Sequence, residues 1–227
     1  MNSNILEIKK INKNFKHRDK LIEIFKNVSL NIKKGDLVAL VGPSGSGKST
    51  LLNMISLIDT PTSGQIIFNN KDMKNLSEEN KTDVRKKNIS MIFQDNNLLT
   101  DFTALENVLL PLIIREEKIK PSQKKAQKIL TDFNLKNRQN HYPDELSGGE
   151  QQRVAIARVL ISETDLILAD EPTGNLDHNT SQEIFSYFLK LKKLNKTIIF
   201  ATHNRDLANK ADYKLSILDG NIKRVNA

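Results

Sequence analysis

Apolar and polar positions alternate in several short segments near the start of the chain. Residues 5–8 and 22–32 alternate in this way and predict antiparallel strands, and "GQIIFNN" (64–70) predicts another. The continuous apolar run "LVALVG" (37–42) is typical of a buried strand, and a helix is expected directly after it at 48–58. The first part of the chain therefore combines an antiparallel region with the start of a buried core.

A helical period replaces this pattern in the middle of the chain. Apolar residues follow it from about 103 to 162, most clearly at 121–135 and 148–161, and another helix is expected around 178–194. Further buried strands are predicted at 88–95, 165–172 and 197–203. Helices and buried strands therefore alternate after the N-terminal region.

This alternation indicates an α/β fold with a parallel sheet. We expect a single domain over residues 1–227, closed by a C-terminal hairpin that turns at Gly220 and Asn221. The core and an antiparallel β-subdomain are expected at about 1–95 and 163–227, with an inserted helical subdomain at about 96–162.

Composition and charge narrow the possible partners. The chain has 227 residues, of which 38% are apolar, and it has no cysteine, which excludes a disulfide framework and any site built on cysteine. The formal net charge is +8, but no basic block is longer than "RKK" (85–87). We therefore expect a solvated basic surface and no nucleic-acid partner.

No stretch of the sequence predicts a membrane span or a signal peptide. The longest apolar run, "VLLPLII" (108–114), is too short to cross a bilayer and contains Pro111. The N-terminal segment "MNSNILEIKK" has no apolar run of the length that a signal peptide requires. We expect a protein that is soluble by itself.

A glycine-rich loop carries the strongest chemical signal. "GPSGSGKST" (42–50) matches the phosphate-binding pattern G-x-x-x-x-G-K-[ST] and lies between a predicted strand and a predicted helix, as that pattern requires. Its glycines let successive backbone N–H groups point at phosphate oxygens, Lys48 would reach the β- and γ-phosphates, and the Ser49 hydroxyl would bind Mg²⁺. The candidate nucleotide-binding residues of the loop are Gly42, Pro43, Ser44, Gly45, Ser46, Gly47, Lys48, Ser49 and Thr50.

Polar residues follow the ends of three predicted strands. Asp170 and Glu171 end "LILADEP"; the first would hold Mg²⁺ and the second would polarise the attacking water. His203 ends "FATH", where it would contact the γ-phosphate, and Gln94 leaves "IFQD" near the metal. Ligands of α/β sheets bind at this edge, so we expect these side chains to share one site.

Phe15 is the candidate for contact with the base. It lies in "INKNFKH", before the first sheet, and its ring would stack on an adenine face.

A second helix start lies far from the glycine-rich loop. In "LSGGEQQR" (146–153), Ser147 and Glu150 form the pattern of a capping box, but a cap does not need Gly148 and Gly149. Exposed backbone N–H groups at a helix start suit a phosphate. Because the chain has no second lysine or metal carboxylate to complete this site, we expect it to serve the nucleotide of another copy. The result would be a homodimer that holds two ATP molecules and opens after hydrolysis.

In this order the motifs resemble those of the nucleotide-binding subunits of ABC transporters, over essentially the whole chain. The resembling motifs are 42–50, Gln94, "LSGGEQQR", Asp170 with Glu171, "GNLD" (174–177) and His203. The resemblance implies a P-loop NTPase (RecA-like) core with an N-terminal antiparallel β-subdomain and an inserted α-helical signature subdomain. It also implies Glu171 as catalytic base, His203 as γ-phosphate sensor, Gln94 as the link from Mg²⁺ to the membrane subunits, and Phe15 as the adenine-stacking residue.

Within that family, "NNLLTDFTALENVLLPLII" (96–114) is similar to the ATPases of lipoprotein-releasing transporters. This implies a peripheral subunit on the cytoplasmic face of the bacterial inner membrane, which contacts integral membrane permease subunits near 94–114. The alternatives are the ATPase of a MacB-type exporter or of a cell-division complex, or a soluble ABC ATPase such as an iron–sulfur assembly ATPase.

Overall fold

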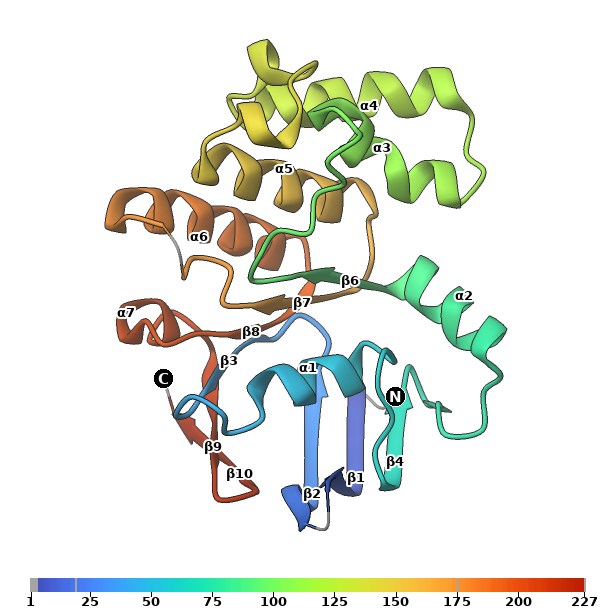
Figure 1. Ribbon diagram of the computed structural model, residues 1–227, viewed down its shortest axis with the longest axis vertical. Coiled ribbons are helices and arrows are strands. Elements are labelled where there is room, and N and C mark those ends of the chain that lie inside the picture. Colours follow the sequence, from blue (N-terminus) through green and yellow to red (C-terminus); the bar gives the residue numbers. More distant parts are fainter. Residues whose placement is uncertain (1–3, 19, 175, 227) are drawn as a thin grey trace.

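Two β-sheets and a group of helices make up the protein (Figure 1). The computed structural model describes residues 4–18, 20–174 and 176–226. The helical region lies at one end of the molecule, a six-stranded sheet lies in the middle, and a four-stranded antiparallel sheet lies at the other end.

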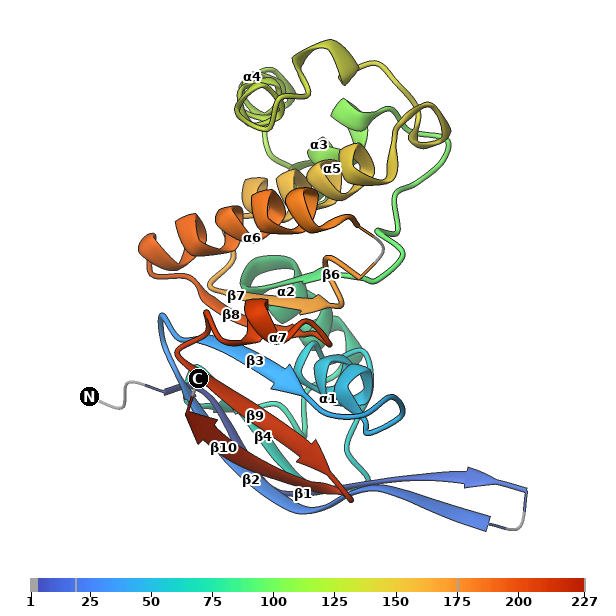
Figure 2. The same ribbon diagram turned by 90° about the vertical axis from the view of Figure 1, so that its left-hand side faces the viewer.

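The smaller sheet is antiparallel throughout. In spatial order its strands are β2 (Lys20–Lys33), β1 (Asn4–His17), β4 (Ser63–Phe68) and β5 (Lys71–Asp72). The end of β1 and the start of β2 form an arm that projects from the body of the molecule (Figure 2). The register between these strands shifts where Lys10 and Asn27 take left-handed backbone angles, both with φ 49°. Such bulges increase the local twist of a strand pair.

The larger sheet is parallel except at one edge. In spatial order its strands are β10 (Asn221–Asn226), β9 (Tyr213–Leu218), β3 (Leu37–Val41), β8 (Thr197–Ala201), β7 (Leu166–Asp170) and β6 (Ile89–Ile92). Only β10 runs antiparallel, as the second strand of the expected hairpin. The carboxyl ends of the other five strands therefore meet at a single edge of the sheet.

Helices cover both faces of this sheet. They are α1 (Lys48–Ile55), α2 (Glu78–Asn88), α3 (Ala104–Ile114), α4 (Ile119–Asp132), α5 (Gly148–Ile161), α6 (His178–Lys193) and α7 (Arg205–Ala208). Alternate residues of β3 point to opposite faces: Leu37 and Ala39 join the core under α3, α5 and α6, whereas Val38 and Leu40 pack with α1 and the antiparallel sheet. The fully apolar run predicted as a buried strand thus serves two cores at once.

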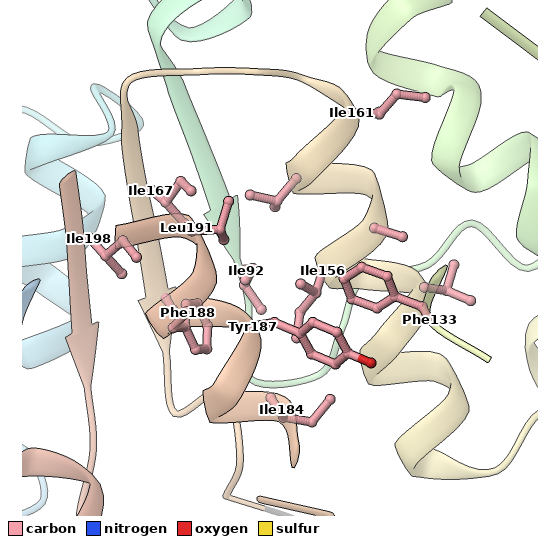
Figure 3. Close-up of a cluster of buried hydrophobic side chains, with 14 of the residues drawn as sticks. Ile92, Phe133, Ile156, Ile161, Ile167, Ile184, Tyr187, Phe188, Leu191 and Ile198 are labelled. Carbon is pink, nitrogen blue, oxygen red and sulfur yellow. The ribbon is translucent and has the colours of Figure 1, made fainter. Parts of the chain in front are cut away.

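Helix α6 joins the helical region to the central sheet. In Figure 3, Phe188 and Leu191 lie on the side of the sheet, near Ile198, whereas Tyr187 faces Phe133 at the end of α4. The two rings stack with centroids 4.0 Å apart and an interplanar angle of 14°. The helical region is therefore fastened to the core by shared buried surface.

The fold class predicted from the sequence is confirmed, with local differences. The first helix ends at Ile55 instead of residue 58. Phe15 lies within β1 and not before the sheet. Helices α2 and α7 were not predicted, because the first is almost wholly polar and the second has only four residues. None of the helices in the described ranges is long and apolar enough to cross a membrane.

Candidate functional site

The glycine-rich loop connects the end of β3 to the start of α1. Gly47 is the N-cap of α1, with φ 102°, and no side chain caps the helix. A Cβ atom at Gly47 would lie 2.7 Å from Ile24 Cγ2 and 2.9 Å from Phe25 Cζ. Both the left-handed angle and the close packing require glycine here. The first N–H groups of α1 are consequently left without a side-chain acceptor and can face an anion.

Lys48 is the first residue of α1 and is buried. Its ammonium group donates hydrogen bonds to the carbonyl oxygens of Gly42 and Pro43, at 3.0 and 3.1 Å. These bonds hold the charge inside the curve of the loop. An ammonium group has three donors, so one remains for a phosphate oxygen.

The predicted strand-end residues lie around one cleft. Lys48, Ser49, Gln94, Asp170, Glu171 and His203 all line a cavity of about 280 Å³, together with Ile24 of β2 and further residues of the glycine-rich loop. Lys48 and Ser49 start α1, whereas the other four residues belong to the neighbouring strands β6, β7 and β8: Asp170 ends β7, and Glu171, Gln94 and His203 lie just beyond the carboxyl ends of their strands. The parallel topology therefore gathers residues that are distant in sequence at one edge.

Glu171 and His203 are in direct contact within this cleft. Glu171 Oε1 lies 3.1 Å from His203 Nε2, and Glu171 Oε2 accepts a hydrogen bond from the His203 backbone N–H at 3.3 Å. Glu171 has φ 46°, a left-handed angle that is uncommon for a residue with a side chain. The Glu171 N–H donates to the carbonyl oxygen of Ala201 on β8, at 3.1 Å, which holds this conformation. Strain of this kind is often found at functional sites.

The helix start at Ser147 has the predicted capping box. The Glu150 N–H donates to Ser147 Oγ at 3.3 Å, and the Ser147 N–H donates to Glu150 Oε2 at 2.8 Å. The two intervening glycines differ in their surroundings. A Cβ atom at Gly149 would lie 3.1 Å from Thr180 Cγ2 on α6, whereas one at Gly148 would meet no described atom within 4 Å. Helix packing therefore accounts for Gly149 but not for Gly148.

The start of α5 opens into a different cavity from that of the glycine-rich loop. This second cavity, of about 250 Å³, is lined by Gly148 and Gln152 together with Gln94 and Glu171. None of the residues lining the first cavity belongs to α5. Within one chain, the two helix starts therefore line different cavities, which share Gln94 and Glu171.

Phe15 lies outside both cavities, on the β1–β2 arm. The residue is 43% exposed, and Lys13 Nζ lies 4.6 Å from the ring centroid. The ring is opposite Ile22 of β2 in the antiparallel register. The side chain is thus partly exposed, with the Lys13 ammonium over its ring, and its stacking on a base stays a prediction.

Two arginines make contacts near the site that the sequence does not predict. Arg158 of α5 donates hydrogen bonds to the carbonyl oxygens of Asn96 and Asn97, each at 2.8 Å, and burial lowers its pKa. Arg138 donates through Nε to Glu150 Oε1 at 2.9 Å. Both contacts join segments that are distant in the chain, and no local pattern signals them.

One residue of the motif at 174–177, Asn175, lies outside the described residues.

The described histidine, aspartate and glutamate side chains do not by themselves form a metal site. Among the residues that the structure describes, no group of three histidine, aspartate or glutamate side chains could hold a metal ion. A metal at the cleft would depend on mixed oxygen ligands instead.

The comparisons with known proteins agree with this geometry. The family described as "ABC transporter" matches residues 25–174. The chain is 45% identical to the lipoprotein-releasing system ATP-binding protein LolD of Rickettsia typhi, over 97% of this chain and 98% of the relative. It is 41% identical to LolD of Legionella pneumophila, over 98% of each chain.

Among solved structures, the chain is similar to the ATP-binding cassette MJ0796 in a dimeric post-hydrolysis state bound to ADP and Pi. That similarity has a TM-score of 0.92 and 38% identity, over 97% of this chain and 98% of the other. The protein cbiO1 of Clostridium perfringens matches with a TM-score of 0.86 and 28% identity, over 99% of this chain and 89% of the other. The chain therefore belongs to the ABC transporter family, as an ATPase subunit.

Proposed function

We propose that this ABC ATPase drives the release of lipoproteins from the bacterial inner membrane towards the outer membrane. The observation that carries this proposal is its 41–46% identity, over nearly the full length, to proteins named as ATP-binding subunits of lipoprotein-releasing systems. It would act as a peripheral subunit on the cytoplasmic face of that membrane, with LolC/LolE-like permease subunits as partners.

Two copies of the chain would form the working unit. The start of α5 and the glycine-rich loop line separate cavities within one chain, and the loop already has its own lysine. A head-to-tail dimer would bring the Ser147, Gly148, Gly149 and Glu150 segment of each copy to the nucleotide held by the other. The dimeric cassette MJ0796, similar at 38% identity, supports this arrangement.

The cleft residues divide the chemistry between binding and hydrolysis. Lys48 and the N–H groups of the loop would bind the phosphates of ATP. Glu171 would accept a proton from the attacking water. His203 contacts both oxygens of the Glu171 carboxylate, so it would orient this carboxylate and also contact the γ-phosphate. Phe15 would stack on the adenine from the arm.

The cleft also suits a magnesium ion. Ser49 offers a hydroxyl oxygen, Gln94 an amide oxygen and Asp170 a carboxylate, and all three line the same cavity. Hard oxygen ligands in small number, completed by phosphates and water, are what Mg²⁺ prefers. When bound, the ion would offset charge on the phosphate oxygens.

A surface near 94–114 would contact the permease subunits. A groove of about 360 Å³ lies between β6 and the helical region, lined in part by Phe93, Pro111 and Ile114. One buried side chain, Asn107, holds the neighbouring loop: its Nδ2 donates to the carbonyl oxygens of Leu99, Phe102 and Thr103, and its Oδ1 accepts from the Leu99 N–H. The Arg158 contacts join this surface to α5.

The proposal is tested by reconstitution. The tagged chain is purified with its membrane partners in mild detergent, and the complex is inserted into liposomes that contain a lipoprotein. We expect the addition of ATP to release lipoprotein into the soluble fraction. The same complex with Glu171→Gln should bind ATP but release no lipoprotein. Purification with soluble proteins alone, such as cluster-assembly factors, would contradict the transport function and leave the ATPase chemistry intact.

A further inference from the structure

The start of α5 carries a charge that opposes its proposed use. A helix N-terminus attracts anions because its first N–H groups are positively polarised. Here the Glu150 carboxylate folds back onto the Ser147 N–H, at 2.8 Å, within the first turn of the helix. The carboxylate occupies the Ser147 N–H as an acceptor, and its negative charge repels an incoming phosphate.

Arg138 meets that carboxylate from outside the helix. It lies in a short 3₁₀ turn, Lys136–Arg138, and its Nε donates to Glu150 Oε1 at 2.9 Å. Each oxygen of the carboxylate thus has one partner, Arg138 on one side and Ser147 on the other. The hydrogen bond from Arg138 is the main reason that the pKa of Glu150 falls to about 2. The carboxylate therefore stays ionised, and the guanidinium group is the nearby charge that balances it.

We propose that Arg138 is a positioning residue for the nucleotide of a second copy: by pairing with Glu150, it keeps the start of α5 attractive to the terminal phosphate. This inference rests on the proposed ATP-dependent dimer. Arg138 does not touch the nucleotide in this scheme. It cancels the charge of the cap while leaving the cap in place, so the unoccupied surface at Gly148 faces the phosphate without a repelling neighbour.

A purely structural role for Arg138 makes a different prediction. The Arg138–Glu150 bond also ties the segment after α4 to the start of α5, so its loss could loosen that segment. In that case, replacing Glu150 by glutamine would not restore what Arg138→Gln removes. If the role is electrostatic, glutamine restores it, because it can form a capping box without a charge.

The test is a double-mutant cycle in full-length protein that carries Glu171→Gln, so that hydrolysis does not open the dimer. The fraction of dimer is measured by light scattering against ATP concentration. We expect Arg138→Gln to raise the ATP concentration for half-maximal dimer about tenfold in the Glu150 background, whereas the double variant with Arg138→Gln and Glu150→Gln should stay within about twofold of the Glu171→Gln parent. The defect should also shrink when salt is raised, because ions screen the uncompensated charge.

Lys125→Gln is the matched control. It removes an exposed pair with Glu163, at 2.6 Å, which joins α4 to the residues after α5, away from the helix start. We expect it to leave the dimer curve unchanged. A parent that does not dimerise with ATP would refute the proposed dimer and this inference with it. A dimerising parent that is unaffected by Arg138→Gln, or equally affected in both Glu150 backgrounds, would refute this inference alone.

Discussion

The starts of α1 and α5 are two versions of a helix N-terminus in one chain. Helix α1 begins at Gly47, has no side-chain cap and has no acidic residue in its first turn. Helix α5 begins at Ser147, has a complete capping box and carries Glu150 in its first turn. The first has Lys48 folded into its loop, and the second has Arg138 paired with its own carboxylate.

This difference separates stability from ligand binding. The glycine N-cap of α1 sacrifices a stabilising hydrogen bond, so its N–H groups remain available, and buried packing of α1 between the two sheets compensates. The capping box of α5 already bonds the N–H groups of Ser147 and Glu150, so only the remaining N–H groups of its first turn could bind a phosphate. In the proposed function, the start of α1 would bind a phosphate with its own lysine, whereas the start of α5 would need a second copy to supply the rest of the site.

Loss of Lys48 should have the largest effect on this comparison. Lys48→Ala removes the cation that holds the loop and would meet the phosphates. We expect ATP affinity to fall by about 3 kcal/mol, roughly 100-fold, measured by titration with a fluorescent nucleotide. Lys196→Ala, which removes a lysine bond to the Glu163 carbonyl oxygen elsewhere, is the control. Equal affinities in the two variants would show that the loop is not the phosphate site.

Gly148→Ala should separate folding from function at α5. The new Cβ meets no described atom, so we expect an unchanged or slightly higher unfolding midpoint. It would, however, occupy the side from which a phosphate approaches, and ATP-dependent dimer formation should weaken about tenfold. Gly149→Ala should instead destabilise the fold, and Thr180→Ser should relieve it by removing the methyl group at 3.1 Å. Normal dimer formation by Gly148→Ala would remove the need for glycine at this position.

Ser147→Ala should cost stability on a smaller scale. The variant loses the acceptor for the Glu150 N–H, and we expect about 1 kcal/mol less free energy of unfolding in urea. Ser77→Ala at α2 removes a cap of the same length, 3.3 Å, far from the proposed dimer contact. The two variants should lose similar stability, but only Ser147→Ala should also weaken the dimer. A matching dimer defect in Ser77→Ala would trace both losses to stability.

The titration of Glu150 should give the smallest but most local signal. Its pKa is lowered from 4.5 to about 2, so the ionised carboxylate stabilises the fold above pH 4.5, and this contribution is lost as the pH falls towards 2. In carboxyl NMR titrations, Arg138→Gln should raise the pKa of Glu150 towards 4.5. The pKa of Glu106, in the capping box of α3, should not change in this variant, because hydrogen bonds from Thr103 and not from Arg138 lower it. An unmoved Glu150 would contradict the role of Arg138.

The sequence predicted those parts of the structure that depend on neighbours in the chain. The loop before Lys48 and the capping box at Ser147 follow from local spacing, and both are present. Helix α2 has no apolar periodicity, so that pattern does not predict it. Its real signals are Ser77 as N-cap and charges that suit the helix dipole, with Glu78 and Glu79 at the start.

Contacts between distant segments were beyond the reach of sequence patterns. The parallel topology explains why Glu171 and His203 meet, and strand ends alone suggested it. Nothing local indicates that Arg138 reaches Glu150 or that Arg158 reaches the carbonyl oxygens of Asn96 and Asn97. These bonds depend on how the helices pack around α6 and the sheet.

The four hydrogen bonds of Asn107 have a kinetic consequence. They hold the loop of residues 99–103 in one shape, so a partner that docks here as proposed would meet a surface that is already ordered. Little conformational entropy is then lost on association, and the encounter need not wait for the loop to fold. The assembly rate of the transporter at this surface would thus be limited by diffusion and orientation, and a single buried amide would set that regime.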